Sequence, residues 1–266
     1  MARRIGSAPR TLTIAFSAIG GVALLFIVLP LVQLYALQSP SGIVRAAGDG
    51  SVRASIALSV EAALATALLA GAAGVPLGYL LARHPFRGRS LVEGIVDVPL
   101  AVPHTVVGIA LLLVFGRTGI VGAPVEAWTG LRFWGTAAGV IVAMLYVSMP
   151  YAVDTSRQAF AAIDSELESV SRTLGAGPWR TFARVTLPLC WRSIVAGMTM
   201  SGARALSEFG AIVILAYYPM TAPVKIYDLF LQGGLNDSAA AAVLFLSVAL
   251  VMFVVLRLLT NRREAL

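Results

Sequence analysis

Lysine, histidine and cysteine are almost absent from this chain of 266 residues, which has one lysine, two histidines and one cysteine. The single Cys190 cannot form a disulfide within the chain, and with only His84 and His104 beside it the usual four-ligand zinc site is excluded. Charged residues are also scarce at 12%, roughly half the share of an average soluble domain. The composition therefore argues against an ordinary water-soluble protein and predicts no metal site.

Apolar residues take the place of the missing charge: 58% of the chain is hydrophobic and its mean hydropathy is +0.86. A helix that crosses a bilayer needs about 20 mostly apolar residues. Six stretches meet this condition, namely 11–37, 54–81, 95–115, 135–153, 193–216 and 239–260. The first is too long for the apolar part of a signal peptide, so we expect it to remain as a span. The sequence thus predicts an all-α integral membrane protein with six transmembrane helices in one domain over residues 1–266, its core being 54–260.

The basic residues predict how the chain is oriented in the membrane. With the N-terminus in the cytoplasm, fourteen of the 20 basic residues fall on the cytoplasmic side and five on the outer side. The outer five are Arg45, Arg53, Arg117, Arg132 and Lys225. Because cytoplasmic loops are enriched in arginine and lysine, both termini are predicted to be cytoplasmic, in a multi-pass protein of the cell (inner) membrane. The net charge of +7 then reflects topology, and no nucleic acid is expected as a partner.

The longest polar loop, residues 154–192, is cytoplasmic in this arrangement. Ser165 and Glu168 have the spacing of a capping box, which predicts the start of a short helix. Gly175, with Pro178 soon after it, predicts the end of that helix.

One face of this short helix is apolar, because Leu167, Val170 and Leu174 recur at helical spacing. A helix of two to three turns is too short to be stable alone. It must therefore dock, either on the spans of this protein or on a cytoplasmic partner.

The same loop resembles the "EAA" loop of ABC importer permeases. That pattern has a glutamate, a glycine seven residues later, and a hydrophobic residue followed after one position by Leu-Pro; here these are Glu168, Gly175, Val185, Leu187 and Pro188. The two alanines that follow the glutamate in the family are replaced by Ser169 and Val170 in this chain. The residue types differ, but the spacing of the motif is the same.

The resemblance implies that Glu168, Leu174, Gly175, Leu187 and Pro188 belong to a coupling helix and its flank, between spans four and five. In the family this helix inserts into a groove on an ATPase subunit, and ATP-driven closure of that subunit moves the attached spans. The resemblance further implies a homodimer of permease subunits, two ATPase subunits and an extracytoplasmic binding protein, all assembled at the lipid bilayer.

The chain has no P-loop of its own for ATP. That motif requires a lysine after a glycine, and the only lysine, Lys225, follows Val224. The sequence therefore predicts a transport subunit that is not an enzyme and holds no cofactor, with ATP and Mg²⁺ bound by a separate subunit.

Arg204 and Glu208 stand four residues apart in the fifth predicted span. Ionisable groups are costly inside a membrane and usually face a protein or water-lined interior. They are expected either to pair with each other or to help attract an anion in the transport pathway. Thr199, Ser201 and Ser207 are candidate hydroxyl donors to a tetrahedral oxyanion in the same pathway.

The third predicted span contains Pro99, Pro103 and His104. Prolines remove backbone donors and can break a helix, and in transporters broken helices often mark the pathway. Pro103 and His104 are therefore candidate pathway residues, although a lone histidine beside a proline is more often a satisfied polar group than a ligand.

Residues 203–211, Ala-Arg-Ala-Leu-Ser-Glu-Phe-Gly-Ala, resemble the signature of the molybdate, tungstate and sulfate branch of ABC permeases. Residues 216–220, 92–99 and 102–109 resemble the molybdate/tungstate members in particular. The resemblance implies import of molybdate or tungstate, with sulfate as the nearest alternative. A secondary transporter is a weaker alternative because no repeated halves are visible, and an intramembrane enzyme lacks a catalytic constellation.

Overall fold

The computed structural model describes the backbone of residues 10–261 and the side chains of residues 11–255. All regular elements in that part of the chain are helices, which confirms the predicted all-α class. The arginines Arg3, Arg4, Arg262 and Arg263, which enter the predicted orientation, lie outside the described residues. Among the described residues, four helices are long and apolar enough to cross a membrane. They are α1 (Arg10–Ala36), α3 (Gly50–Arg83), α7 (Ala137–Ala161) and α13 (Leu235–Asn261).

The third predicted span is not one continuous helix, and it is interrupted beside a proline, as the sequence allows. It is divided into α4 (Arg89–Ala101) and α5 (His104–Phe115), whose axes are bent by 113°. Pro103 lacks the N–H that would continue the helical ladder, and it holds Val102 in an extended conformation (φ −83°, ψ 135°). Counted as one bent span, this pair raises the number of candidate spans to five.

The fifth predicted stretch is also divided, into α10 (Leu187–Leu206) and α11 (Gly210–Leu215). α10 begins six residues before the predicted start at 193 and has Pro188 in its first turn, where a proline is tolerated. The interruption at residues 207–209 contains no proline, and its cause lies in the side-chain contacts of Glu208 described below.

Six shorter elements join the long helices. Five are α-helical and the sixth, η1, is a single π-helical turn. They are α2 (Pro40–Gly48), α6 (Gly122–Thr129), α8 (Ser165–Thr173), α9 (Pro178–Thr181), η1 (Phe182–Thr186) and α12 (Ala222–Gly233).

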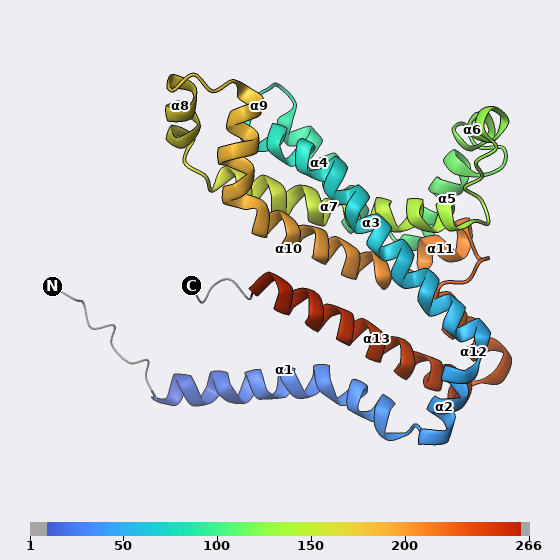
Figure 1. Ribbon diagram of the computed structural model, residues 1–266. Coiled ribbons are helices and arrows are strands. Elements are labelled where there is room, and N and C mark those ends of the chain that lie inside the picture. Colours follow the sequence, from blue (N-terminus) through green and yellow to red (C-terminus); the bar gives the residue numbers. More distant parts are fainter. Residues whose placement is uncertain (1–9, 262–266) are drawn as a thin grey trace.

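The core lies where α3, α7 and α10 run side by side (Figure 1). Small residues let the backbones of α3 and α7 approach closely: a Cβ atom on Gly78 would lie only 2.9 Å from the carbonyl oxygen of Val153. By contrast, α1 is apolar on all sides. Its most apolar segment is not buried against the other helices of the described chain. One hydrogen bond of 2.8 Å, between the hydroxyls of Tyr35 and Ser247, joins α1 to α13.

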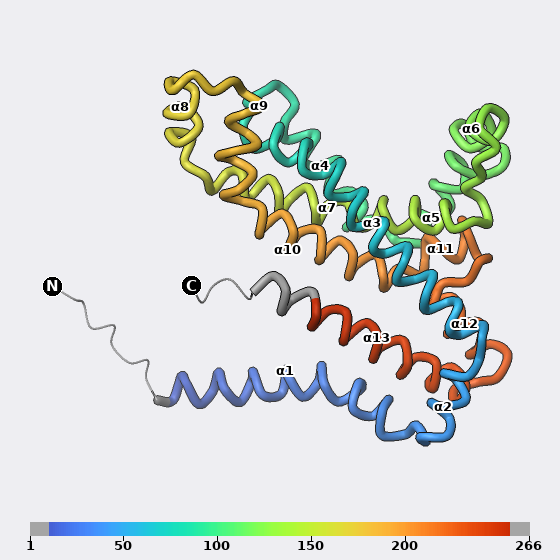
Figure 2. The backbone as a smooth tube through the Cα atoms, in the orientation of Figure 1, coloured from blue at the N-terminus to red at the C-terminus, as the bar shows by residue number. Residues whose placement is uncertain are grey.

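The helices place three parts of the chain at one end of the molecule. The beginning of α1, the end of α13 and the α8–α9 segment lie at the left of Figure 1, whereas α2, α6 and α12 lie at the right. The smooth trace in Figure 2 shows the same division, with α3, α7 and α10 connecting the two ends.

Candidate functional site

The loop that resembles a coupling segment does form a helix, α8, but the cap of that helix differs from the prediction. The N-cap residue is Asp164, whose carboxylate accepts a hydrogen bond of 2.9 Å from the backbone N–H of Glu166. The predicted capping box of Ser165 and Glu168 is therefore wrong. Glu168 does not reach back to the start of the helix because its side chain pairs with Arg83 of α3, which is 14% exposed.

The predicted end of this helix is confirmed at Gly175, which has a φ of +86°. Its N–H donates to the carbonyl of Arg172 at 3.0 Å, and the N–H of Ala176 donates to that of Ser171 at 3.1 Å. This pair of bonds is a Schellman motif, in which a left-handed residue closes the helix and glycine carries no steric cost.

Glu168 fastens α8 to two other elements. Its carboxylate is 3.1 Å from Arg83 Nη2 at the end of α3 and accepts a hydrogen bond of 2.9 Å from the Thr186 hydroxyl in η1. Only 6% of Glu168 is exposed, so this contact is shielded from water. Arg172, on α8 itself, approaches the same carboxylate more loosely, at 3.9 Å, and is largely exposed. Sequence reasoning missed Arg83 and Thr186, because nothing in the local pattern connects them to a glutamate so distant in sequence.

The remaining coupling residues continue this anchorage into α10. Leu187 packs against a buried cluster of Phe160, Cys190 and Ile194, and Pro188 is exposed in the first turn of α10. α8 is thus connected through η1 to one continuous helix that runs toward the other end of the molecule.

The apolar face of α8 points away from the rest of the chain. Leu167, Val170 and Leu174 are all exposed, Leu174 to 83%, and Trp179 at the start of α9 is exposed to 84%. Of the two docking alternatives, packing of this face on the spans of the same chain is therefore excluded.

A second group of predicted residues meets where the two broken helices come together. We call His104, Arg204 and Glu208 the helix-break cluster. Arg204 Nη2 lies 2.9 Å from Glu208 Oε2 and 2.9 Å from His104 Nε2, and His104 Nδ1 lies 3.2 Å from Glu208 Oε2. Arg204 Nη2 also lies 3.1 Å from His104 Nδ1, and because an arginine nitrogen can only donate, the ring nitrogen that pairs with it is the acceptor.

The prediction that Glu208 lies on the same helix as Arg204 is wrong. α10 ends at Leu206, and Glu208 stands in the interruption before α11, where its Oε1 accepts a hydrogen bond of 2.8 Å from the N–H of Ala211. One buried carboxylate, 1% exposed, therefore holds the end of α10, the start of α11 and the start of α5. This capping contact takes the place of a continuous helical ladder at the break.

α5 and α11 also approach each other closely beside this cluster. A Cβ atom on Gly210 would lie 2.8 Å from the Cβ of His104, and one on Gly108 would lie 3.0 Å from the carbonyl oxygen of Ala211. Larger residues at either glycine would separate the two short helices. The pair therefore forms one packed unit attached to α10 through the helix-break cluster.

The three predicted hydroxyl donors are not brought together. Ser207 is exposed beside the cluster, where its hydroxyl donates to the Arg204 carbonyl at 3.0 Å. Thr199 donates to the Val195 carbonyl at 2.8 Å and lines an apolar cavity between α3, α10 and α13, whereas Ser201 is fully buried. The cluster thus offers one hydroxyl, Ser207, together with the partly exposed Arg204.

A further charged group lies in α4. Glu93 contacts Arg89 of the same helix at 3.0 Å and Arg157 of α7 at 3.4 Å. Within residues 11–255 no three side chains of histidine, cysteine, aspartate or glutamate gather in a way that could hold a metal ion.

Comparison with known proteins identifies the family to which this chain is similar. Residues 74–264 match the family model described as "Binding-protein-dependent transport system inner membrane component". The molybdate/tungstate transport system permease protein of Thermococcus kodakarensis is 41% identical over 252 residues, covering 94% of this chain and 96% of that one. The molybdenum transport system permease protein of Escherichia coli K12 is 35% identical and covers 74% of this chain and 88% of its own length.

Solved structures show the same fold at lower identity. A chain of a bacterial ABC transporter involved in the import of alginate superimposes with a TM-score of 0.70 at 21% identity, covering 95% of this chain and 96% of that chain. Because the family model spans well over half of the sequence and the relatives cover nearly all of it, this chain belongs to the family of binding-protein-dependent transport system inner membrane components.

Proposed function

We propose that this chain is the membrane-spanning permease subunit of an ATP-driven ABC importer that carries molybdate or tungstate into the cytoplasm. The observation that carries the proposal is the 41% identity, over 94% of the chain, to a protein named as a molybdate/tungstate transport permease. The exposed apolar face of α8 supports it, since a permease must present a docking surface to its ATPase.

In this proposal the chain crosses the membrane six times, with α4–α5 and α10–α11 each counted as one interrupted crossing. α10 alone has 20 residues, or about 30 Å of helix, which matches the apolar thickness of a bilayer. Both termini and α8 are cytoplasmic, as the distribution of basic residues predicts. The whole chain then forms one transmembrane domain.

We further propose that two copies assemble with two ATPase subunits and an extracytoplasmic binding protein. Each α8 docks into an ATPase subunit through Leu167, Val170 and Leu174, and ATP and Mg²⁺ are bound there and not by this chain. When the ATPase subunits close, α8 moves, and its anchorage through Glu168 and η1 carries the movement into α3 and α10. ATP binding then opens the pathway outward and hydrolysis returns it inward.

The helix-break cluster lies beside the pathway between the two copies. Arg204 is partly exposed there, next to the Ser207 hydroxyl, and its positive charge favours a passing dianion. Because Glu208 neutralises much of that charge, binding is weak, as conduction requires. The chain performs no covalent chemistry.

Uptake into liposomes tests this function. The chain is co-produced with its ATPase subunits, reconstituted, and supplied with the binding protein and labelled molybdate. We expect uptake to require both ATP and the binding protein, and we expect unlabelled molybdate and tungstate to compete while a tenfold excess of sulfate does not. Equal competition by sulfate would identify a sulfate importer, and uptake driven by an ion gradient without ATP would identify a secondary transporter.

Substitution of Gly175 tests the coupling segment. Valine at this position must adopt a φ of +86°, at a cost of about 1–2 kcal/mol, so the end of α8 should shift and ATP-dependent uptake should fall about tenfold. Gly177→Ala is the matched control, because Gly177 has a φ of −69° and nothing lies within 4 Å of an added Cβ. Gly175→Asn should retain most of the activity, since asparagine tolerates the left-handed region. Unchanged uptake with Gly175→Val would contradict the assignment.

A further inference from the structure

A small lobe stands at the end of the molecule opposite α8. We call residues 115–134, which connect α5 to α7 and include α6, the outer lobe. It projects away from the long helices in Figure 1. Its turns are closed by backbone hydrogen bonds, of which Gly119 N–H to the Gly116 carbonyl and Val121 N–H to the Val114 carbonyl are both 2.9 Å. The outer lobe is therefore held in a defined conformation by its own backbone hydrogen bonds.

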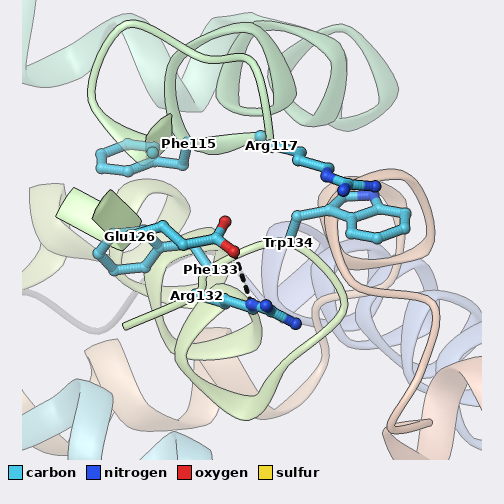
Figure 3. A pocket seen from close by; sticks show the side chains of 8 residues that line it. Phe115, Arg117, Glu126, Arg132, Phe133 and Trp134 are labelled. Atoms are coloured by element: carbon cyan, nitrogen blue, oxygen red, sulfur yellow. Dashed lines mark ion pairs between the residues drawn. The ribbon is translucent and has the colours of Figure 1, made fainter. Parts of the chain in front are cut away.

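The outer lobe encloses a pocket of about 140 Å³. Its walls combine aromatic rings with charged groups. The side chains that define it are Phe115, Arg117, Glu126, Arg132, Phe133 and Trp134 (Figure 3).

The charges in this pocket do not balance. Glu126 Oε1 and Arg132 Nε form an ion pair at 2.6 Å, so these two groups neutralise each other. Arg117 lies on the opposite side, next to Trp134 in Figure 3, and is exposed. Within the described residues no acidic side chain lies within salt-bridge distance of it. The pocket thus carries one surplus positive charge, on the side of the membrane where the topology rule predicts few arginines.

Several large apolar side chains of the outer lobe are exposed, and one of them, Trp134, lines the pocket. Trp128 is exposed to 89%, Ile120 to 80%, and Trp134 and Leu131 to about half. Exposed tryptophan and arginine around a pocket are the composition of a protein interface, in which a few such residues supply most of the binding energy.

We propose that the outer lobe is the docking surface for the extracytoplasmic binding protein, and that an acidic side chain of that protein enters the pocket beside Arg117. This inference rests on the proposed function, because it places the lobe outside the cell and supplies the partner. A carboxylate carries one negative charge, which Arg117 alone can neutralise, and its apolar neighbours can pack on Trp128 and Trp134. A free dianion is a poorer occupant, since the Glu126 carboxylate forms part of the wall.

The experiment measures the affinity of the purified binding protein for the reconstituted permease–ATPase complex. Arg117→Glu should weaken binding at least tenfold by turning attraction into repulsion, and Trp134→Ala should weaken it about tenfold by removing the ring beside the pocket. Arg117→Lys keeps the charge and should remain within about threefold of the parent. Raising the salt concentration should weaken the parent complex more than the Arg117→Glu complex.

Arg45→Glu is the matched control, because it reverses an exposed arginine on the same side of the molecule but outside the outer lobe. It should leave the affinity unchanged, and the ATPase activity measured without binding protein should be the same in all variants. Parent-like affinity in Arg117→Glu and Trp134→Ala, or an equal loss in Arg45→Glu, would overturn this docking site while leaving uptake by the parent intact. Failure of the parent complex to bind the binding protein or to take up molybdate would count against the proposed function itself.

The lipid bilayer is the alternative surface that the outer lobe could contact. A further measurement distinguishes contact with lipid from contact with the binding protein. In a variant that retains Trp134 as its only tryptophan, fluorescence should be unaffected by brominated lipids and should change when the binding protein is added. Strong quenching by brominated lipid would place the outer lobe in the membrane and overturn the proposal.

Discussion

Replacing Glu168 by alanine should reduce ATP-dependent uptake by at least tenfold and weaken the association of the chain with its ATPase. The glutamate is the shared partner of Arg83 and Thr186, so its loss releases α8 from both α3 and η1. It also leaves Arg83 without its carboxylate in a site where that side chain is only 14% exposed. Removing one member of such a shielded pair costs about 2–3 kcal/mol, and 1.4 kcal/mol is already a tenfold change in an equilibrium.

Two variants separate anchorage from a general loss of charge. Arg83→Ala removes the close, shielded contact at 3.1 Å and should resemble Glu168→Ala, whereas Arg172→Ala removes the exposed contact at 3.9 Å and should change uptake less than twofold. Co-purification of the ATPase and uptake are measured together for all three. An effect of Arg172→Ala as large as that of Arg83→Ala would contradict the anchoring role of the buried contact.

Arg204→Ala should lower anion uptake by at least tenfold while the permease–ATPase complex still assembles. The substitution removes the positive charge beside the pathway and leaves the Glu208 carboxylate with only His104 and the Ala211 N–H as partners. The remaining negative charge then repels a dianion, because electrostatic interactions are strong in a site shielded from water. Initial rates of uptake, together with the melting temperature of the complex, measure the two effects separately.

The double variant Arg204→Ala, Glu208→Ala decides what the cluster does. If Arg204 serves the pathway, removing both charges should leave uptake well below that of the parent, although repulsion by the glutamate is gone. Arg204→Lys keeps the charge and should recover part of the rate. Uptake at the parental rate in the double variant would show that the pair is only a structural joint between the helices.

The coupling segment shows how far local sequence rules reach. Gly175 was predictable as the end of α8, because a left-handed C′ residue is a local requirement of the backbone. The start of the helix was wrong by one residue, and Glu168 was assigned to a cap it does not form. The capping box failed because the partly shielded Arg83 at the end of α3 competes for the same carboxylate, and Arg83 is 85 positions earlier in the chain.

The two helix breaks differ in the same way. The break before His104 follows from Pro103, whose missing N–H is visible in the sequence. The break at residues 207–209 has no such residue, and an uninterrupted helix was the natural prediction for an apolar stretch. It exists because Glu208 caps α11 and contacts His104 at the same time, and both contacts require α5 to be in place.

What the sequence by itself determined is the set of properties that depend on composition and on near neighbours. These are the apolar lengths that make this an all-α membrane protein, the bias of its arginines, the missing P-loop and the spacing that resembles a coupling loop. The tertiary structure alone decided which charges meet. Arg83 contacts Glu168, and His104 contacts a residue pair about 100 positions away, because close packing at small residues such as Gly78 and Gly210 sets the register between helices. An ion pair depends on that register, which no local pattern encodes.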